Sequence, residues 1–373
     1  MSLTIKPVET PRDLKAFINF HYNLYKDNPS WVPPLRMDEF NTLSRTKNPA
    51  FDFCDAQYWL AVYNGKIVGR IAGIINHSYI NIWQKKDARF GWMDFVDDSE
   101  VSHLLLSTVE QWAMENDMQS LHGPLGFTDF DAEGLLVEGF DELSTFGAGY
   151  NAPYYARHLE DNNYSKDVDY LEYQVTMNGK IPEKVERLAN IAASRNKLSM
   201  LRVKKAKELL PYAHEIFEVI NQSYKALYGF VPLTKRQIDV YVKQYFGFIK
   251  PEYVPVVLDR QGKVAAFGIT MPSLSYAMQK NQGRLLPFGF LSMLRAMNNN
   301  PRADLYLTAV RPDLQNKGVN AMLMYEINKV FIQNNIKYVE TNRELEHNTK
   351  VQAQWRFYDA RQHKRRRVYK KVL

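Results

Sequence analysis

The chain has 373 residues, which favours two domains over one. Its 45% hydrophobic and 24% charged residues exclude a largely disordered protein, and no run of about 18 apolar residues indicates a membrane span. Cys54 is the only cysteine, so an internal disulfide is excluded, and the N-terminus lacks a signal-peptide pattern, so a cytoplasmic location is expected. The net charge of +7 is confined to residues 361–373.

The first half is predicted to contain a β-hairpin, further strands and two helices. The dipeptide Asn64-Gly65 separates two β-rich runs and is a strong signal for a two-residue turn. Asp98 or Ser99 is expected to cap a helix whose apolar residues follow at helical spacing. The predicted elements are a hairpin over 58–76, a strand over 89–96, a helix over 97–117, a short strand at 120–126, a helix over 151–164 and a strand over 167–175.

The second half is predicted to repeat the same order of elements. Each hairpin carries a turn glycine, and the second is expected to turn near residues 260–262. Similarity at a spacing of ~200 residues indicates a duplicated α+β unit with its boundary in 176–197. The predicted elements are a strand over 198–205, helices over 208–225 and 234–249, a hairpin over 253–271, a strand over 303–310, a helix over 318–335, a strand over 337–344, a helix over 349–360 and a strand over 365–372.

The loop between the strand at 303–310 and the following helix has the composition of an anion site. A helix N-terminus presents free backbone N–H groups and the positive end of a dipole. Gly318 allows close approach, Lys317 adds positive charge, and no acidic residue occurs between Leu314 and Tyr325. An ordinary capped turn is the alternative interpretation.

The corresponding position of the first half serves as an internal comparison. Asp97, Asp98 and Glu100 stand there in place of the polar, glycine-containing loop. Carboxylates stabilise a helix N-terminus and repel a phosphate. One copy is therefore expected to bind an anion, and the other to be blocked.

The second half resembles the GNAT family of acyl-CoA-dependent N-acyltransferases at this loop. The family's motif, Gln or Arg-x-x-Gly-x-Gly or Ala between a strand and a helix, stands here as Gln315-Asn-Lys-Gly318-Val-Asn320. Asn320 departs from the small third residue of the motif. The segments 338–348 and 355–371 also resemble the family's later strands and last helix. The resemblance implies an α+β fold of tandem GNAT units, each a mixed, mostly antiparallel sheet flanked by helices, with a degenerate domain at 1–178 and an acyltransferase domain at 190–373.

The resemblance also implies an acyl-CoA site, with acetyl-CoA or a longer acyl-CoA as co-substrate. The strand edge would bind pantetheine, and the loop amides would bind the pyrophosphate. The cofactor-binding residues implied are Thr308, Ala309, Val310, Gln315, Asn316, Lys317, Gly318, Val319, Asn320 and Asn348.

The catalytic residues are predicted less directly. Tyr358 is similar in position to the family's general-acid tyrosine, and a core aromatic beside Trp355 is its alternative. Glu340 and Asn342 share one face of a strand and are candidates for handling the proton of the amine. A solvent-facing strand residue is the alternative for Glu340.

No metal site is expected. The acidic series Asp129-x-Asp131-x-Glu133 resembles the start of a calcium loop, but it lacks the bidentate glutamate at the required spacing. No cysteine or histidine joins the cluster.

The leading hypothesis is direct acyl transfer from CoA to a small amine or amino-lipid. The insertion at 274–297 would line an acyl tunnel or make a peripheral membrane contact. A non-catalytic acyl-CoA sensor is the first alternative. Nucleic-acid binding through the basic residues 361–373 is the second, and it is not expected, because a terminal strand explains this run. A monomer or a homodimer fits the sequence equally.

Overall fold

The computed structural model describes residues 2–373, which form two compact units. The first unit comprises the chain up to Leu171 together with Leu274–Met293 and His363–Leu373. The second comprises Glu172–Ser273 and Leu294–Gln362. The units are therefore not continuous halves of the sequence: relative to the expected domains 1–178 and 190–373, the segments 274–293 and 363–373 lie with the first unit.

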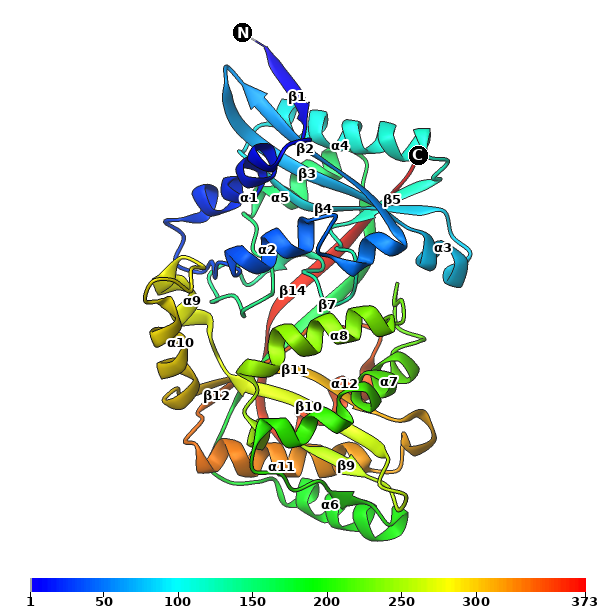
Figure 1. Ribbon diagram of the computed structural model, residues 1–373, viewed down its shortest axis with the longest axis vertical. Helices are drawn as coiled ribbons and strands as arrows, with labels where there is room; N and C mark the ends of the chain where they lie inside the picture. Colours follow the sequence, from blue (N-terminus) through cyan, green and yellow to red (C-terminus); the bar gives the residue numbers. More distant parts are fainter. Residues whose placement is uncertain (1) are drawn as a thin grey trace. The chain divides into compact units, whose positions relative to one another are not determined.

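The first unit is an open sheet covered by helices on both faces (Figure 1). Its strands follow the order β1-β2-β3-β4-β5-β14, and β6 also pairs with β14. One apolar core lies under α4 and α5, and a second lies under α1. The elements are β1 (Leu3–Pro7), α1 (Pro11–Tyr25), α2 (Arg36–Leu43), η1 (Pro49–Asp52), β2 (Cys54–Tyr63), β3 (Lys66–Asn76), α3 (His77–Trp83), β4 (Asp87–Phe95), α4 (Ser99–Glu115), β5 (Ser120–Gly123), β6 (Leu135–Glu138), α5 (Tyr154–Asp161), the start of β7 (Ser165–Thr176), α9 (Ser275–Asn281), the start of α10 (Gly289–Asn298) and most of β14 (Asp359–Val372).

The second unit has the strand order β7-β12-β11-β10-β9-β8. The helix α11 lies along α6 and packs against the sheet (Figure 1). The elements are the end of β7, α6 (Glu183–Asn196), β8 (Ser199–Met200), η2 (Ala206–Tyr212), α7 (Ala213–Ser223), α8 (Lys235–Tyr245), η3 (Phe246–Phe248), η4 (Pro251–Tyr253), β9 (Val256–Leu258), β10 (Val264–Pro272), the end of α10, β11 (Arg302–Val310), η5 (Pro312–Leu314), α11 (Val319–Gln333), β12 (Tyr338–Thr341), β13 (Glu344–Leu345), α12 (Thr349–Gln352), η6 (Ala353–Phe357) and the start of β14.

Each sheet is completed by a strand from the other half of the sequence. Lys370 and Lys371 of β14 pair with His122 and Leu121 of β5 in the first unit. In the second unit, Val175 of β7 pairs with Val339 of β12. Sequence periodicity predicted both strands but not this exchange.

Both predicted hairpin turns are confirmed. Asn64 and Gly65 have φ values of 49° and 77°, the pair of positive values that a type I′ hairpin turn requires. Gly262 has φ 75° in the turn between β9 and β10.

Several predicted elements are shorter than expected, three of them markedly. The strand predicted at 198–205 is only β8, and the helix predicted at 208–225 starts with a 3-10 segment that contains Pro211, whose ring nitrogen has no hydrogen to donate. The helix predicted at 349–360 ends early, because the chain must become extended at Tyr358 to enter β14. The helix α6 lies in the predicted boundary region 176–197.

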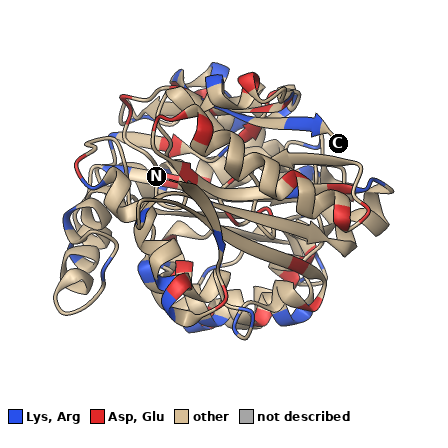
Figure 2. Cartoon of the chain, turned by 90° about the horizontal axis from the view of Figure 1, so that it is seen from above, with Lys and Arg blue, Asp and Glu red and all other residues tan. Residues whose placement is uncertain are grey.

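The basic C-terminal run is a strand, as expected. The ribbon that ends at the C-terminus is strongly basic (Figure 2). Within the first unit, Arg367 Nε donates to Asp169 Oδ1 at 2.8 Å, and Lys370 and Lys371 reach Asp87 and Glu110 at 2.9 and 2.8 Å. These three cations are thus neutralised by carboxylates of the first unit itself.

Asp169 is the centre of this charge network, and its removal is expected to destabilise the first unit. Burial raises its pKa, but hydrogen bonds from Arg367 and Lys166 hold the pKa below its usual value. Asp169 is only 1% exposed. Asp169→Asn removes the buried counter-charge of two half-buried arginines, Arg365 and Arg367, and should lower the free energy of unfolding by about 1–3 kcal/mol in a thermal or urea denaturation.

Asp55→Asn is the matched control, because Asp55 forms an exposed pair with His77 at 2.7 Å. An exposed pair contributes roughly 0–1 kcal/mol. Equal melting temperatures for the two variants would contradict the role assigned to Asp169.

Candidate functional site

The N-terminus of α11 has no side-chain cap. Gly318 occupies the N-cap position in the left-handed region, with φ 78°, and no side chain accepts a hydrogen bond from the first turn. Among the described residues, the backbone amides of 316–320 have no acceptor in the chain. Buried Leu314 and Val319 fix the two ends of the loop in the apolar core. The loop therefore presents several adjacent donors from a rigid base.

The charge of this loop is positive on balance. Asp313 precedes the loop, but Arg311 holds it through two contacts, Nε to Oδ1 at 2.7 Å and Nη2 to Oδ2 at 3.2 Å. Lys317 is exposed and forms no ion pair within residues 2–373. Gln315 and Asn316 are also exposed, and Gln315 Nε2 donates to Val310 O at 3.1 Å. An anion that approached these backbone amides would therefore meet the cation of Lys317, while the carboxylate of Asp313 is already paired with Arg311.

The first unit closes the equivalent helix end with its own carboxylate. Asp98 is the N-cap of α4, and its Oδ1 accepts from the amides of Glu100 at 2.9 Å and Val101 at 3.3 Å. The predicted cap is thus confirmed. Asp97 contacts Arg157 and His158 at 2.9 and 2.8 Å. The contrast expected between the two copies is present in the structure.

The strands β11 and β12 run parallel over a short length and then separate. Their register joins Arg302–Leu305 to Tyr338–Thr341, and β11 continues to Val310 without this neighbour. On its other side, β11 pairs with β10 up to Val310, with a register shift opposite Tyr306. One edge of residues 306–310 therefore has no strand partner.

Side chains reach the carbonyl groups of this edge. Asn342 Nδ2 donates to Tyr306 O at 2.8 Å, Tyr224 Oη to Thr308 O at 3.0 Å, and Ser223 Oγ to Val310 O at 2.9 Å. Ser223 ends α7, and Tyr224 follows it. Asn342 thus lies where the strands part, and two hydroxyl groups that sequence reasoning did not include reach the same edge.

The matching edge in the first unit is closed by backbone. Strand β4 pairs with β5 only over Asp87–Arg89, and Leu125 N then donates to Phe90 O at 2.8 Å. A Cβ at Gly123 would lie 2.2 Å from Phe90 O, so only glycine allows this approach. No comparable backbone contact closes β11 among the described residues of the second unit.

Tyr358 is oriented by a side chain of α11. Its Oη accepts a hydrogen bond from Asn328 Nδ2 at 2.8 Å, so the phenol keeps its own proton to donate. Burial raises the pKa of Tyr358 to about 12. The ring of Tyr358 also packs near that of Trp355, with the ring centroids 6.0 Å apart. Tyr358 is therefore both an aromatic residue packed on the core and a possible proton donor.

The remaining predicted residues occupy less direct positions. Glu340 is 6% exposed rather than solvent-facing, and its Oε1 accepts from Gln174 Nε2 at 2.8 Å. Asn320 Nδ2 donates to Gln354 Oε1 at 3.0 Å, which ties the start of α11 to η6. Asn348 is the N-cap residue of α12, without a side-chain cap hydrogen bond.

Glu344 is a candidate that sequence reasoning missed. Its Oε1 accepts from Trp355 Nε1 at 2.9 Å, whereas its Oε2 is buried and has no hydrogen-bond partner within residues 2–373. Burial raises the pKa of Glu344 to about 8. The strand alternation that joins Glu340 and Asn342 extends to this residue, and that was the signal available in the sequence.

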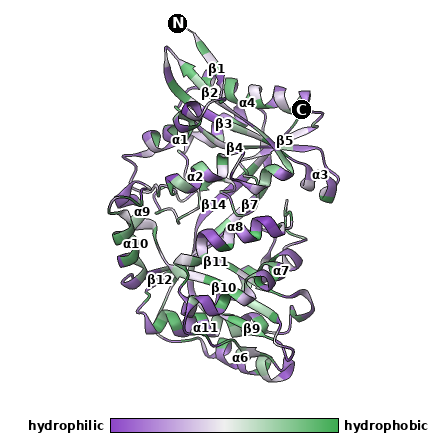
Figure 3. Ribbon diagram, viewed as in Figure 1, coloured by the Kyte–Doolittle hydropathy of each residue, from purple (hydrophilic) through white to green (hydrophobic). Residues whose placement is uncertain are grey.

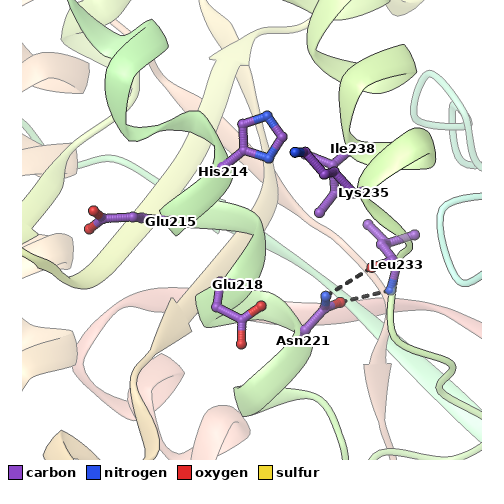
Figure 4. A pocket seen from close by; sticks show the side chains of 7 residues that line it. All are labelled: His214, Glu215, Glu218, Asn221, Leu233, Lys235 and Ile238. Atoms are coloured by element: carbon purple, nitrogen blue, oxygen red, sulfur yellow. Dashed lines mark hydrogen bonds between the residues drawn. The ribbon is translucent and has the colours of Figure 1, made fainter.

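A separate pocket of about 380 Å³ lies between α7 and α8 of the second unit (Figure 4). Asn221 holds Leu233 there through two hydrogen bonds of 2.8 and 3.0 Å. His214 and Lys235 lie close together, and Glu215 is engaged by Lys263 at 3.0 Å. The lining residues are His214, Glu215, Glu218, Asn221, Leu233, Lys235 and Ile238. None of the site residues predicted from the sequence lines it.

Metal-binding clusters and membrane-spanning helices are both absent from residues 2–373. No group of three or more His, Cys, Asp or Glu side chains is placed to hold a metal ion. No helix in the same residues has the length and apolarity to cross a membrane.

Two curated proteins are similar to the chain in sequence. No protein-family model matches the chain. Protein YghO from Escherichia coli (strain K12) is 29% identical over 97% of this chain and 93% of its own length. The bacterial ceramide synthase of Caulobacter vibrioides is 28% identical over 78% of this chain and 76% of its own length.

Two solved structures resemble the whole chain. A tandem GNAT protein from the clavulanic acid biosynthesis pathway superposes with a TM-score of 0.59 and 13% identity, covering 100% of this chain and 98% of its own. A GCN5-related N-acetyltransferase from Sphaerobacter thermophilus has a TM-score of 0.53 and 10% identity, covering 99% and 95%. The chain therefore has the tandem GNAT fold, with the motif-bearing loop in its second unit and a helix end capped by Asp98 at the equivalent place in its first.

Proposed function

We propose that the second unit binds acyl-CoA and transfers its acyl group to an amine. The observation that carries this proposal is the contrast between two equivalent helix ends. The amides at the start of α11 are uncapped, whereas Asp98 caps those of α4. A duplicated element that keeps its donors free in one copy only is best explained by an anionic ligand at that copy. The similar solved structure named a GCN5-related N-acetyltransferase supports the proposal of acyl transfer from CoA to an amine.

The pyrophosphate of CoA suits the loop over 315–320. Gly318 admits a close approach, and Lys317 supplies a mobile cation. The separated edge of β11, including Thr308, Ala309 and Val310, suits an extended amide-containing chain, which can add to a strand as another strand would. The hydroxyl groups of Ser223 and Tyr224, which donate to the carbonyls of Val310 and Thr308, would then be the first groups to donate to the bound ligand instead.

Two titratable groups match the proton transfers that aminolysis of a thioester needs. An alkyl amine with a pKa near ~10.4 is mostly protonated at neutral pH, so it must lose a proton before its nitrogen attacks the carbonyl carbon. Glu344, whose free oxygen is buried and whose pKa is raised to about 8, is suited to take that proton. As the C–S bond breaks, the sulfur needs a proton, and Tyr358 retains one.

The acceptor proposed is an amine that carries a hydrocarbon chain. One relative is named a ceramide synthase, and ceramide is an N-acylated amino-lipid. The relative matches 78% of this chain. An amino-lipid acceptor and a long-chain acyl-CoA donor follow as the first substrates to examine, ahead of small polar amines.

Tyr358→Phe is expected to lower kcat by about 100-fold, with little change in the KM for acyl-CoA, because the hydroxyl acts on the leaving sulfur rather than on binding. Tyr338→Phe, a change on a partly exposed tyrosine of β12, is the control. The measurement is release of free thiol under saturating donor. An unchanged kcat would identify Tyr358 as a core aromatic only.

The proposal as a whole is tested by calorimetric titration of the chain with CoA, acetyl-CoA and palmitoyl-CoA, followed by thiol release with a panel of amines. Binding of at least one of these ligands is expected, with turnover for a long-chain amine. Failure of all three ligands to bind would overturn the proposal. Binding without turnover of any amine would leave a non-catalytic acyl-CoA-binding protein.

A further inference from the structure

The segment from Tyr276 to Arg295 exposes an unusual amount of apolar surface. Leu286 and Phe288 are 76% and 73% exposed, although leucine and phenylalanine are among the residues most often buried. Most of α10 is hydrophobic (Figure 3). Six of the 17 large hydrophobic side chains that are exposed in the described chain fall in these few turns: Tyr276, Leu286, Phe288, Phe290, Leu291 and Leu294. We call this set the apolar patch.

The part of this segment up to Met293 rests on a fixed base in the first unit, to which it belongs. Gln279 Nε2 donates to the carbonyls of Pro29 at 2.7 Å and Trp31 at 2.8 Å. The amide of Arg36 donates to Gly283 O at 3.1 Å, and Met278 and Met293 are buried beneath the two helices. The apolar side chains are thus held outward while the opposite side of α9 and α10 is already packed.

The charge around the patch has one sign. No acidic residue occurs between Asp259 and Asp304. Within the segment, Lys280, Arg284 and Arg295 are exposed, and none of them forms an ion pair with the described residues. A partner that covers the patch should therefore combine an apolar interior with negative charge at its edge.

A second copy of the chain fits this requirement poorly. A two-fold contact through the patch would place the same three cations of each copy against each other, and no carboxylate of the segment would compensate them. A bilayer surface with anionic headgroups fits it well. Leucine and phenylalanine side chains enter the boundary of the acyl region, while lysine and arginine contact phosphates.

We propose that α9, α10 and the connection between them dock the protein on the surface of an anionic membrane. The short helix α10 lies in the interfacial plane, with Phe290, Leu291 and Leu294 toward the acyl chains. The connection supplies Leu286 and Phe288, its two most exposed apolar side chains. This surface is distinct from the acyl-CoA loop, and its membrane contact holds whether or not the second unit is an enzyme.

The test is co-sedimentation of the full chain with vesicles of phosphatidylcholine alone and with about 30% phosphatidylglycerol added. Binding to the anionic vesicles is expected to be at least about tenfold tighter and to weaken as salt is raised. Phe288→Ser with Leu291→Ser should reduce it by about tenfold or more. Ile82→Ser with Met114→Ser, which removes two exposed side chains elsewhere in the first unit, is the matched control and should bind as the parent does.

Two further variants separate the contributions of charge and apolar contact. The combination Lys280→Gln, Arg284→Gln and Arg295→Gln should abolish the preference for anionic vesicles while leaving the melting temperature unchanged, because these side chains are exposed and unpaired. Phe288→Trp should show a blue shift of its emission on vesicle addition. Absence of binding to either vesicle, or a concentration-dependent dimer that Phe288→Ser with Leu291→Ser dissociates, would overturn the proposal.

Discussion

Gly318→Asp is expected to weaken CoA binding by about 100-fold, or ~2.7 kcal/mol. The substitution gives α11 the cap that α4 already has, because an N-cap aspartate accepts hydrogen bonds from the first-turn amides. The donors proposed for the pyrophosphate are then occupied, and a negative charge stands where the ligand's own charge must lie. The measurement is calorimetric titration with CoA at fixed ionic strength.

Gly318→Asn is the control that isolates the charge. Asparagine has nearly the same shape as aspartate and is among the non-glycine residues that best tolerate the left-handed conformation with φ 78°. It should lower the affinity much less than aspartate does. Equal loss in both variants would mean that backbone strain or bulk, and not charge, governs the site, and unchanged affinity in Gly318→Asp would remove the loop from the binding site.

Glu344→Gln is expected to lower kcat by about 10²–10⁴-fold while making the protein more stable. The loss of activity follows if the buried Oε2 is the proton acceptor, because an amide is not a base at neutral pH. For the parent protein, kcat should rise with pH as Glu344 ionises, with an apparent pKa near its raised value of about 8.

The gain in stability has a definite pH dependence. The folded-state pKa of Glu344 is raised by burial from 4.5 to about 8, so the folded protein binds one proton more than the unfolded chain between these values. The parent therefore loses stability as pH rises through this window, and the glutamine variant does not. At pH 8 we expect the variant to gain about 1–3 kcal/mol in free energy of unfolding by urea denaturation.

Glu252→Gln is a suitable control, because Glu252 is an exposed glutamate of the same unit. It should alter neither kcat nor the slope of stability against pH. A Glu344→Gln protein with normal kcat and the parent's pH slope would show that this carboxyl group is an ordinary solvated one.

The parts of the fold that depend on local chemistry were predictable from the sequence. The turn at Asn64-Gly65, the cap at Asp98 and the uncapped Gly318 each follow from the conformational preference of one or two residues. The strand–loop–helix at 303–335 was found for the same reason, since the apolar period changes at a glycine.

The parts that depend on distant contacts were not predictable. Strand alternation alone places Glu344 with Glu340 and Asn342, but its burial depends on Trp355 and the core, which remove it from water. Tyr224 and Ser223 reach β11 from α7, more than eighty residues earlier in the chain. The periodicity of a sequence does not predict which carbonyl group will accept a hydrogen bond from a given side chain.

The assignment of strands to units was hidden for the same reason. The runs at 167–175 and 365–372 read as strands, and each was assigned to the half in which it occurs. Pairing of Lys371 with Leu121 and of Val175 with Val339 shows otherwise. Alternation defines a strand and its faces, but the partner is chosen by register and core complementarity over the whole chain.

The exchanged strands have a consequence for biosynthesis. Residues 363–373 leave the ribosome after the whole second unit has been made, yet they complete the sheet beside β5. Until then the growing polypeptide exposes the open edge of β5, a site for mispairing that chaperones commonly shield. A ribosome that stalls shortly before residue 363 therefore releases a chain whose second unit is complete in sequence but whose first unit still lacks its last strand.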